Sequence, residues 1–315
     1  MTEITHRTIE TNGIRLHIAE CGEGPLVLLV HGFPELWYSW RHQLPALAAA
    51  GFHVVAPDVR GYGESDKPHD IAAYAIKNMI ADYLGLLDAL GEQTAVIVGH
   101  DWGAPQAWNS AALHPDRYRA VVGMSVPHFG RFPIKPTDAL KATFGDTWFY
   151  ILYFQEPGKA EAEFEADPHR TMRMMLGAGQ NFDAQAAATR KKDATFFQDV
   201  PDVTTLPAWI SEEDVRYFGD AFAKSGFRGP LNKYRTMDLD WEQLPELAEK
   251  KIDQPALFIT GDRDPVKTFS PPAEGMRALI PNLTGIVEIK DAGHWVQQER
   301  PDDVNAALIK FLRAL

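Results

Sequence analysis

The sequence predicts an α/β fold, with a mostly parallel central sheet covered by helices on both faces and a helical lid inserted in the chain. Short apolar runs alternate with longer segments of helical periodicity, which is typical of parallel strands joined by crossover helices. This alternation stops at about residue 130 and resumes after 239, as an insertion between two core strands requires. The 315 residues, 45% of them hydrophobic, suffice for one large domain with such an insertion.

The first elements form a hairpin and the beginning of the sheet. Apolar and polar residues alternate over 9–11 and 14–18, on either side of Asn12-Gly13, and Asn-Gly is the favoured two-residue hairpin turn. Continuous apolar runs over 26–30 and 52–56 predict strands that are buried on both faces. The Ala- and Leu-rich segment 44–50 predicts a helix between them.

The alternation then continues toward the middle of the chain. Apolar residues at 76, 80, 83, 87 and 90 share one helical face, and Gly91 is placed to end that helix. Residues 95–98 predict a strand, 104–113 a helix that tolerates Pro105 in its first turn, and 120–124 the next strand. Further strands are predicted at 256–260 and 286–289, followed by a closing helix whose apolar face includes Val304 and Leu308.

The segment 130–239 lacks strand-like runs. Residues 159–165 and 212–218 look helical, and bulky apolar side chains gather between them, at Met172, Met174, Met175, Phe196 and Phe197. We therefore predict a core made of residues 1–129 and 240–315, with residues 130–239 as a helical lid over the carboxyl ends of the strands. The alternative, a separate helical domain on a linker, is disfavoured because sheet-forming sequence resumes afterwards and must return to the same core.

Composition limits the partners and the compartment. The net charge is −12 and the pI is near 5.4, with Lys and Arg scattered, so no nucleic-acid partner is expected. The single cysteine, Cys21, allows no intrachain disulfide and fits a reducing cytoplasm. No apolar signal segment and no run long enough to span a bilayer is evident, so we expect a cytoplasmic protein. The oligomeric state stays open, with a homodimer as one alternative.

A sharp turn with an acidic residue at its tip follows the strand predicted at 95–98. Gly99-His100-Asp101-Trp102-Gly103 is the frame of a nucleophile elbow, Gly-x-Nu-x-Gly, with aspartate in place of the usual serine. A serine attacks acyl groups, whereas a carboxylate displaces a leaving group from carbon and forms an alkyl ester. Asp101 could instead be a helix N-cap, a position that favours aspartate. That interpretation would leave the flanking glycines and the later histidine unexplained.

Three further motifs follow predicted strands, where open α/β sheets bind their ligands: His31-Gly32-Phe33-Pro34-Glu35, Gly261-Asp262-Arg263-Asp264 and Gly293-His294-Trp295. Nucleophile, acid and histidine then occur in the chain order of an α/β-hydrolase triad. We predict Asp101 as nucleophile, His294 as general base and Asp264 as its carboxylate partner, with Asp262 as the alternative. The backbone N–H groups of Phe33 and Trp102 are the predicted oxyanion donors.

Other chemistries have little support in the sequence. There is no His-Glu-x-x-His and no Cys-x-x-Cys, so no metal is expected, and the glycine-rich 61–65 lacks a P-loop lysine. No Gly-x-Ser-x-Gly occurs, which counts against an esterase. We expect no cofactor, and we expect His31 and His100 to support their loops.

These motifs give the chain its family resemblance. Together with Trp37-Tyr38-Ser39-Trp40-Arg41 and segments 61–65, 153–158 and 226–232, they resemble soluble epoxide hydrolases of the α/β-hydrolase superfamily. The resemblance covers nearly the whole chain, lid included, and the extra phosphatase-like domain of the vertebrate members has no counterpart. It implies the α/β-hydrolase fold, detoxification as a role, and a small apolar epoxide and water as partners.

The resemblance also implies site residues in the lid. Two lid tyrosines that protonate the epoxide oxygen correspond to Tyr150 and Tyr234, with Tyr153 as an alternative for the first. Ile151 stands where some members have glutamine, which implies a more apolar wall. The implied pocket residues are Phe33, Pro34, Trp102, Ile151, Tyr153 and Trp295.

The implied reaction converts an epoxide to a vicinal diol through an ester on Asp101. Two rivals stay open: a haloalkane or haloacid dehalogenase with the same Asp-His-Asp triad, and a hydrolase-fold ligand receptor without turnover. Phe33 stands where haloalkane enzymes often have asparagine, and a tyrosine pair has no task in halide release.

Overall fold

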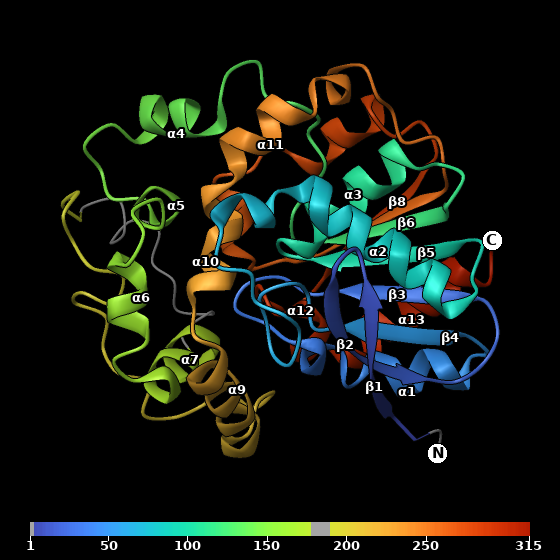
Figure 1. The fold of residues 1–315 in the computed structure, drawn as a ribbon, viewed down its shortest axis with the longest axis horizontal. Helices are drawn as coiled ribbons and strands as arrows, with labels where there is room; N and C mark the ends of the chain where they lie inside the picture. Colours follow the sequence, from blue (N-terminus) through green and yellow to red (C-terminus); the bar gives the residue numbers. More distant parts are fainter. Residues whose placement is uncertain (1–2, 178–189) are drawn as a thin grey trace.

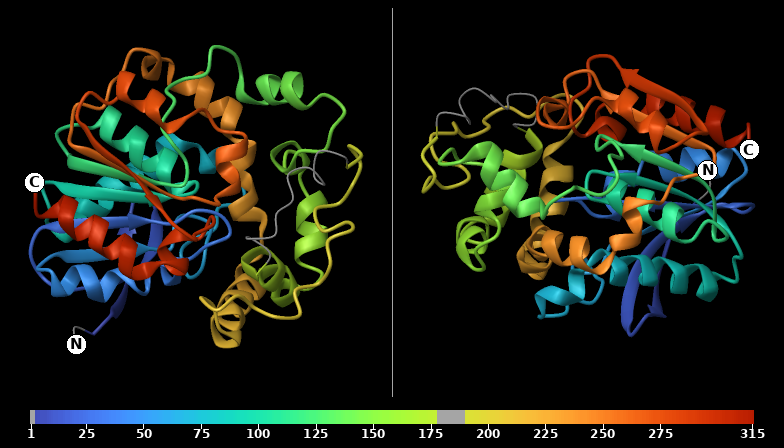
Figure 2. Two further views of the ribbon diagram at one scale, coloured as in Figure 1. Left: turned by 180° about the vertical axis from the view of Figure 1, so that it is seen from behind. Right: turned by 90° about the horizontal axis from the view of Figure 1, so that it is seen from above.

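The structure is a computed structural model that describes residues 3–177 and 190–315 (Figure 1). A twisted sheet with its helices forms one side of the molecule, and a group of helices from the middle of the chain forms the other (Figure 2). Residues 1 and 2 of the predicted core and residues 178–189 of the predicted lid lie outside the described part.

In the described residues, eight strands form one sheet in the order β1-β2-β4-β3-β5-β6-β7-β8. The first two strands form the predicted hairpin, with Thr11 opposite Ile14, and the hairpin pairs with β4 in antiparallel fashion. The remaining pairs, from β4 through β3 to β8, are parallel. The prediction of a mostly parallel sheet is therefore confirmed. The strands are β1 (Thr5–Thr11), β2 (Ile14–Cys21), β3 (Leu26–Val30), β4 (His53–Pro57), β5 (Ala95–His100), β6 (Tyr118–Met124), β7 (Ala256–Gly261) and β8 (Leu283–Ile289).

Helices cover both faces of this sheet. On β3, Val27 and Leu29 pack with residues of α1 and α13, whereas Leu28 and Val30 pack with residues of α2 and α3. Burial on both faces explains why this strand is a continuous apolar run. The core helices are α1 (Gln43–Ala49), α2 (Ile76–Leu90), α3 (Gly103–Leu113), α12 (Val296–Glu299) and α13 (Pro301–Leu312), with 3-10 turns η1 (Trp37–Trp40), η2 (Ile71–Tyr74), η4 (Pro245–Ala248), η5 (Pro265–Thr268) and η6 (Ala273–Ala278).

The chain between β6 and β7 is helical. In Figure 1 these helices stand beside the sheet, and α10 lies between the sheet and the helices farther out. Helix α11 runs across the predicted lid boundary at residue 239, and the division into core and lid stays a prediction. The helices are α4 (Pro136–Phe144), α5 (Tyr150–Tyr153), α6 (Lys159–Phe164), α7 (Pro168–Gly177), α9 (Glu212–Ser225), α10 (Arg228–Arg235) and α11 (Met237–Gln243).

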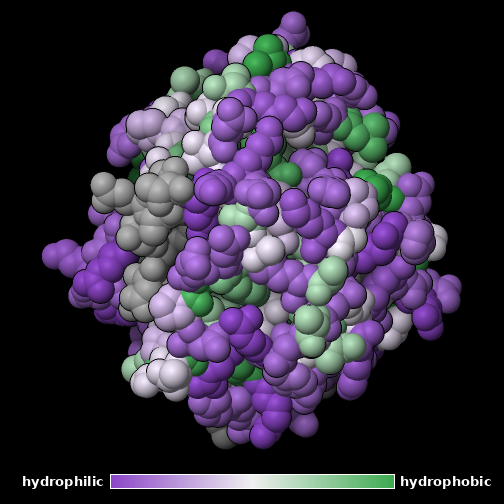
Figure 3. Space-filling view, turned by 90° about the vertical axis from the view of Figure 1, so that its left-hand side faces the viewer, coloured by the Kyte–Doolittle hydropathy of each residue, from purple (hydrophilic) through white to green (hydrophobic). Residues whose placement is uncertain are grey.

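The helices between β6 and β7, which we call the lid, share one apolar cluster with the core. Phe154, Phe164 and Phe218 are fully buried, as is Met172, one of the bulky residues noted in the sequence. The outward face of the lid is mostly hydrophilic (Figure 3). Its bulky apolar side chains therefore hold the lid helices to one another and to the core.

A helix that crosses a membrane needs about 20 mostly apolar residues. Across residues 3–177 and 190–315, the helices are too short or too polar for that task.

Candidate active site

The turn between β5 and α3 has the crowded geometry of a nucleophile elbow. Asp101 adopts a positive φ of 51°, which a non-glycine residue rarely does. A Cβ at Gly99 would lie 2.0 Å from the carbonyl oxygen of Gly103, and one at Gly103 would lie 2.1 Å from that of Val30. Both positions therefore require glycine, as the Gly-x-Nu-x-Gly frame predicts.

The Asp101 carboxylate is held between a backbone donor and a histidine. The backbone N–H of Phe33 donates to Oδ1 at 2.7 Å, while Oδ2 lies 3.4 Å from Nε2 of His294. Gly32 makes this approach possible, because a Cβ there would lie 2.3 Å from Oδ1. The amide nitrogen of Trp102 lies beside the same glycine, and its role as a second donor stays a prediction.

His294 is bonded to Asp264 on its other side. Its Nδ1 lies 3.1 Å from Oδ1 of Asp264, which also accepts from the Val266 N–H at the start of η5. Asp262, the alternative acid, instead accepts from the backbone N–H of Ala292, in the loop that leads to His294. The structure therefore brings Asp264, and not Asp262, into contact with the histidine.

These contacts shift the pKa values of the histidine and its partner. Burial lowers the pKa of His294, but the charges and hydrogen bonds of Asp264 and Asp101 outweigh burial and hold it well above its ordinary value. Burial likewise opposes ionisation of Asp264, and the His294 charge outweighs it and lowers the pKa of that carboxyl. The contacts with Asp264 and Asp101 therefore favour the imidazolium form of His294 in the free site.

The two predicted lid tyrosines lie next to each other over this site. Tyr150 begins α5 and Tyr234 belongs to α10, and their ring centroids are 6.1 Å apart. Tyr234 packs edge-on against Phe33, whose amide donates to Asp101, at 5.3 Å and against Trp102 at 5.0 Å. Burial, helped by the charge of Asp101, raises the pKa of both phenols, so both stay neutral donors.

Tyr153 is oriented differently. Its hydroxyl donates to Glu163 at 2.6 Å, and its ring packs near Trp148. The bond to Glu163 occupies the phenol that proton donation would need. The geometry therefore favours Tyr150 over Tyr153 as the first lid tyrosine, and it does not place Tyr153 beside Asp101.

The other predicted pocket residues border the site to different degrees. The Trp295 ring lies 4.7 Å from the His294 ring and is almost fully buried. Ile151 is half-buried against the same apolar cluster as Phe33 and Tyr234. Pro34 is buried and follows Phe33 through a cis peptide bond. All are compatible with an apolar wall, and their contact with substrate stays a prediction.

A buried network that sequence reasoning missed connects the site's loops. The carboxylate of Glu35 accepts from the Gly32 N–H at 2.8 Å and from the Gln297 amide at 2.8 Å, and it lies 2.7 Å from Nδ1 of His100. Burial disfavours the charged form, but His100 outweighs it and lowers the pKa of Glu35 to about 2. Nε2 of His100 lies 2.8 Å from the carbonyl oxygen of His294. No spacing in the sequence pairs Glu35 with His100, although both stand inside the quoted motifs.

His31 supports its loop, as predicted. Its Nε2 accepts from the Val59 N–H at 3.0 Å, so Nδ1 carries the proton and donates to the carbonyl of Gly32 at 2.9 Å. The ring therefore fixes the loop that presents the Phe33 amide.

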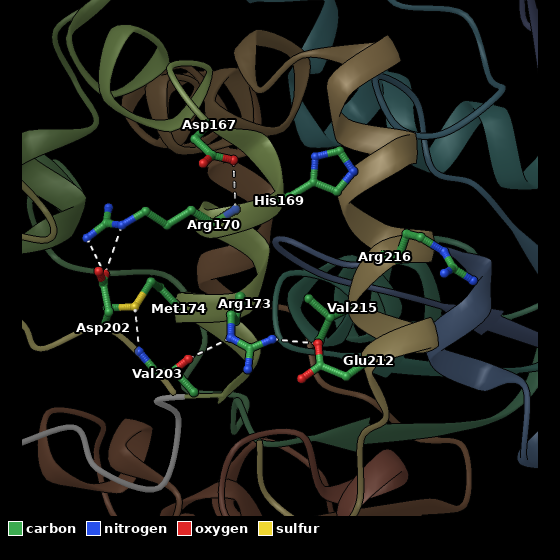
Figure 4. Close-up of a pocket in the computed structure, with 10 residues that line it drawn as sticks. All are labelled: Asp167, His169, Arg170, Arg173, Met174, Asp202, Val203, Glu212, Val215 and Arg216. Carbon is green, nitrogen blue, oxygen red and sulfur yellow. Dashed lines mark hydrogen bonds and ion pairs between the residues drawn. The ribbon is translucent and has the colours of Figure 1, made fainter. Parts of the chain in front are cut away.

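A separate pocket of about 500 Å³ lies in the lid between α7 and α9 (Figure 4). Two of its cationic side chains are bonded to acceptors that also line it: Arg170 to Asp202, and Arg173 to Glu212 and the carbonyl of Val203. These bonds connect α7 with residues 202–203 and with α9, whereas Arg216, which also lines the pocket, is exposed. The described residues include no cluster of three or more His, Cys, Asp or Glu suited to a metal ion.

Known proteins resemble this chain over its full length. The alpha/beta hydrolase fold family matches residues 25–301. Epoxide hydrolase A of Mycobacterium tuberculosis H37Rv is 50% identical over 99% of this chain and 98% of its own length. Epoxide hydrolase 3 of Siraitia grosvenorii is 41% identical over 99% of both chains. The crystal structure of epoxide hydrolase A from Mycobacterium thermoresistibile superposes with a TM-score of 0.95, at 50% identity, over 99% of this chain and 98% of that one.

The architecture, with an aspartate at the elbow and the lid above it, agrees with these similarities. The predicted fold class and family are thereby confirmed. The chain belongs to the epoxide hydrolases of the α/β-hydrolase fold family, which are hydrolases that act on ether bonds.

Proposed function

We propose that this epoxide hydrolase opens small apolar epoxides to vicinal diols in two steps, through an ester formed on Asp101. One observation carries the proposal: the Asp101 carboxylate has one oxygen on the Phe33 amide and the other toward His294. The oxygen on the amide becomes the ester carbonyl, and the oxygen that faces His294 attacks carbon. An ester formed this way already has its oxyanion donor in place.

In the first step, Oδ2 of Asp101 bonds to a ring carbon and the carbon–oxygen bond of the epoxide breaks. Tyr150 and Tyr234 donate hydrogen bonds to the oxygen as alkoxide character develops. Because burial keeps both phenols neutral, they can donate throughout the step.

Ester formation also prepares His294 for its own task. It removes the negative charge of Asp101, which is one of the two charges that hold the pKa of His294 high. The alkoxide takes a proton from one of the two phenols, and the proton that the imidazolium releases restores that phenol. The ester complex contains a neutral imidazole and a neutral hydroxyl group.

In the second step, neutral His294 takes a proton from water, and the hydroxide attacks the ester carbonyl of Asp101. The tetrahedral oxyanion faces the Phe33 amide. Its collapse breaks the bond from carbonyl carbon to substrate oxygen, and the diol leaves with the acid proton of the new carboxyl group. Asp101 is again a carboxylate and His294 an imidazolium oriented by Asp264.

The lid tyrosines support this chemistry over the rival readings. A dehalogenase binds its leaving halide through N–H donors, and it has no use for two neutral phenols above the nucleophile. Diol formation from styrene oxide, with no halide release from haloalkanes, is the expected result. A receptor without turnover would give neither product. The cytoplasmic location and the homodimer alternative stay predictions.

Isotope labelling in heavy-oxygen water tests the covalent step. After a single turnover the label should appear in the Asp101 carboxylate, detected by mass spectrometry of its peptide, and the diol should be unlabelled. Asp101→Ala should lower turnover by at least about 10⁴-fold while the protein stays folded. Asp262→Asn is the matched control and should keep activity. Label that appears directly in the diol would overturn the covalent mechanism.

A further inference from the structure

The segment Trp37–Arg41 has no task in the chemistry above, yet it is bonded to the lid. The Trp37 indole N–H donates to the hydroxyl of Tyr217 at 2.9 Å, and the Tyr38 hydroxyl donates to Oδ1 of Asp214 at 2.9 Å. The rings of Tyr38 and Tyr217 stack with centroids 4.0 Å apart. Both lid residues belong to α9. This core segment is therefore a docking point for that helix.

Arg41 adds a second connection at the same place. Its Nε lies 3.2 Å from Oδ1 of Asp214, and its Nη1 donates to Oε1 of Gln298 at 2.6 Å and to the carbonyl of Tyr38 at 3.1 Å. The Arg41 side chain is 9% exposed and that of Asp214 16%, so the ion pair is shielded from water. We call Arg41 with Asp214 and Gln298 the Arg41 bridge.

Each end of the Arg41 bridge leads to a reacting group. Asp214 lies in the first turn of α9, which ends at Ser225, and the next helix, α10, carries Tyr234. Gln298 lies in α12, which directly follows His294 and Trp295. The Arg41 guanidinium thus connects α9, the helix before α10 and Tyr234, with α12, the helix after His294.

We propose that Arg41 is a positioning residue that holds Tyr234 and His294 in their places for the two steps. The assignment of steps rests on the proposed function. A small displacement of a reacting group slows its step steeply. Because Arg41 contacts the supports of both groups, its loss should slow both steps. Arginine suits this task because its fork of N–H donors reaches several acceptors at once, whereas lysine offers a single flexible ammonium.

Hydrogen exchange of the full chain tests the physical connection without any chemistry. Arg41→Met should raise exchange both in the first turn of α9 and in residues 294–299. Asp214→Asn should raise it only in α9, and Gln298→Met only in residues 294–299. Arg216→Met is the matched control. Arg216 is an exposed cation of α9, the helix of Asp214, and its ion-pair partner is Glu213 at 3.7 Å. That control should leave both regions unchanged.

Single-turnover kinetics then test the effect on each step. Arg41→Met should slow ester formation and ester hydrolysis by about tenfold each, with a smaller loss in Arg41→Lys. Asp214→Asn should slow only formation, and Gln298→Met only hydrolysis. If Arg41→Met fails to fold, Arg41→Lys and the two partner variants still measure this partition.

A double variant separates positioning from simple stability. Arg41→Met alone leaves the Asp214 carboxylate shielded and without its cationic partner, although Tyr38 and Ser211 still donate to it. Adding Asp214→Asn removes that charge and should recover part of the lost melting temperature. If Arg41 positions the two groups, the double variant stays slow in both steps. Recovery of both rates, or exchange in Arg41→Met that rises in one helix only, would overturn the proposal. Coupled exchange without any ester phase would instead overturn the two-step mechanism and leave the bridge standing.

Discussion

The core and the lid build opposite walls of one site. From the core come ionisable groups on loops at the strand ends: His294 contacts Asp101 on one side and Asp264 on the other. From the lid come two neutral phenols: the Tyr234 ring contacts Phe33, Trp102 and Phe154, and the Tyr150 ring contacts Phe154. The comparison teaches that nucleophile and proton donor need different surroundings. The nucleophile lies against the His294 imidazole, while burial keeps the phenols protonated.

The largest effect should come from removing the base in the charged wall. His294→Gln keeps a hydrogen-bonding side chain but cannot take a proton from water, so the ester on Asp101 should form and persist. Steady-state turnover should fall by at least about 10³-fold. Intact-protein mass spectrometry should show a mass gain equal to that of one epoxide.

A histidine far from the site provides the matched control for this loss. His169→Gln changes an exposed histidine of the lid that pairs with Asp220. It should keep turnover and accumulate no ester. If His294→Gln loses activity without any mass gain, His294 is needed before the ester forms, and the division of tasks between the walls is wrong.

A smaller effect should come from the neutral wall. Tyr234→Phe or Tyr150→Phe removes one donor to the developing alkoxide, and each should slow ester formation by about 10²-fold. Ester hydrolysis should change less, since it depends on His294. Rapid-quench measurement of the two phases separates these rates.

Tyr153→Phe is the control within the same lid helix. Its hydroxyl is bonded to Glu163, so its loss should cost about 1 kcal/mol of stability and leave the rate of ring opening unchanged. A slow Tyr153→Phe beside a normal Tyr150→Phe would show that Tyr153 is the donor.

The same comparison explains how much the sequence could predict. In the core, the parallel sheet sends residues that follow each strand to one edge, so Phe33, Asp101 and Asp264 were predictable from their positions after strands. Local glycines even indicated the sharp turn at Asp101. The choice between Asp262 and Asp264 needed the structure, because both follow β7 and only the turn into η5 decides which faces His294.

In the lid, no comparable rule exists. Helical periodicity predicted that helices form there, but Tyr150 and Tyr234 were selected by resemblance, since phenols at helix ends carry no positional signal. Their placement depends on packing between segments far apart in the chain, such as Tyr234 against Phe33. The Glu35–His100 pair and the Arg41 bridge escaped prediction for the same reason, because each joins residues that are far apart in the chain through side-chain contacts.

The smallest expected effect is on stability, and it reports the charge of the core wall directly. The pKa of His294 is raised in the folded protein, so between about pH 6.5, where the unfolded residue titrates, and that raised value the native state holds one more proton than the unfolded chain. The stabilisation is therefore fully present below about pH 6.5 and is lost as pH rises through the folded pKa, with a slope of up to about 1.4 kcal/mol per pH unit.

Urea unfolding across this range should show a steeper decline in the free energy of unfolding for the native protein than for His294→Gln. The two proteins differ only at residue 294, so the difference between their curves reports the titration of the histidine. Parallel curves would mean that the imidazole is neutral in the free site, and the charge contrast between the two walls would then be lost.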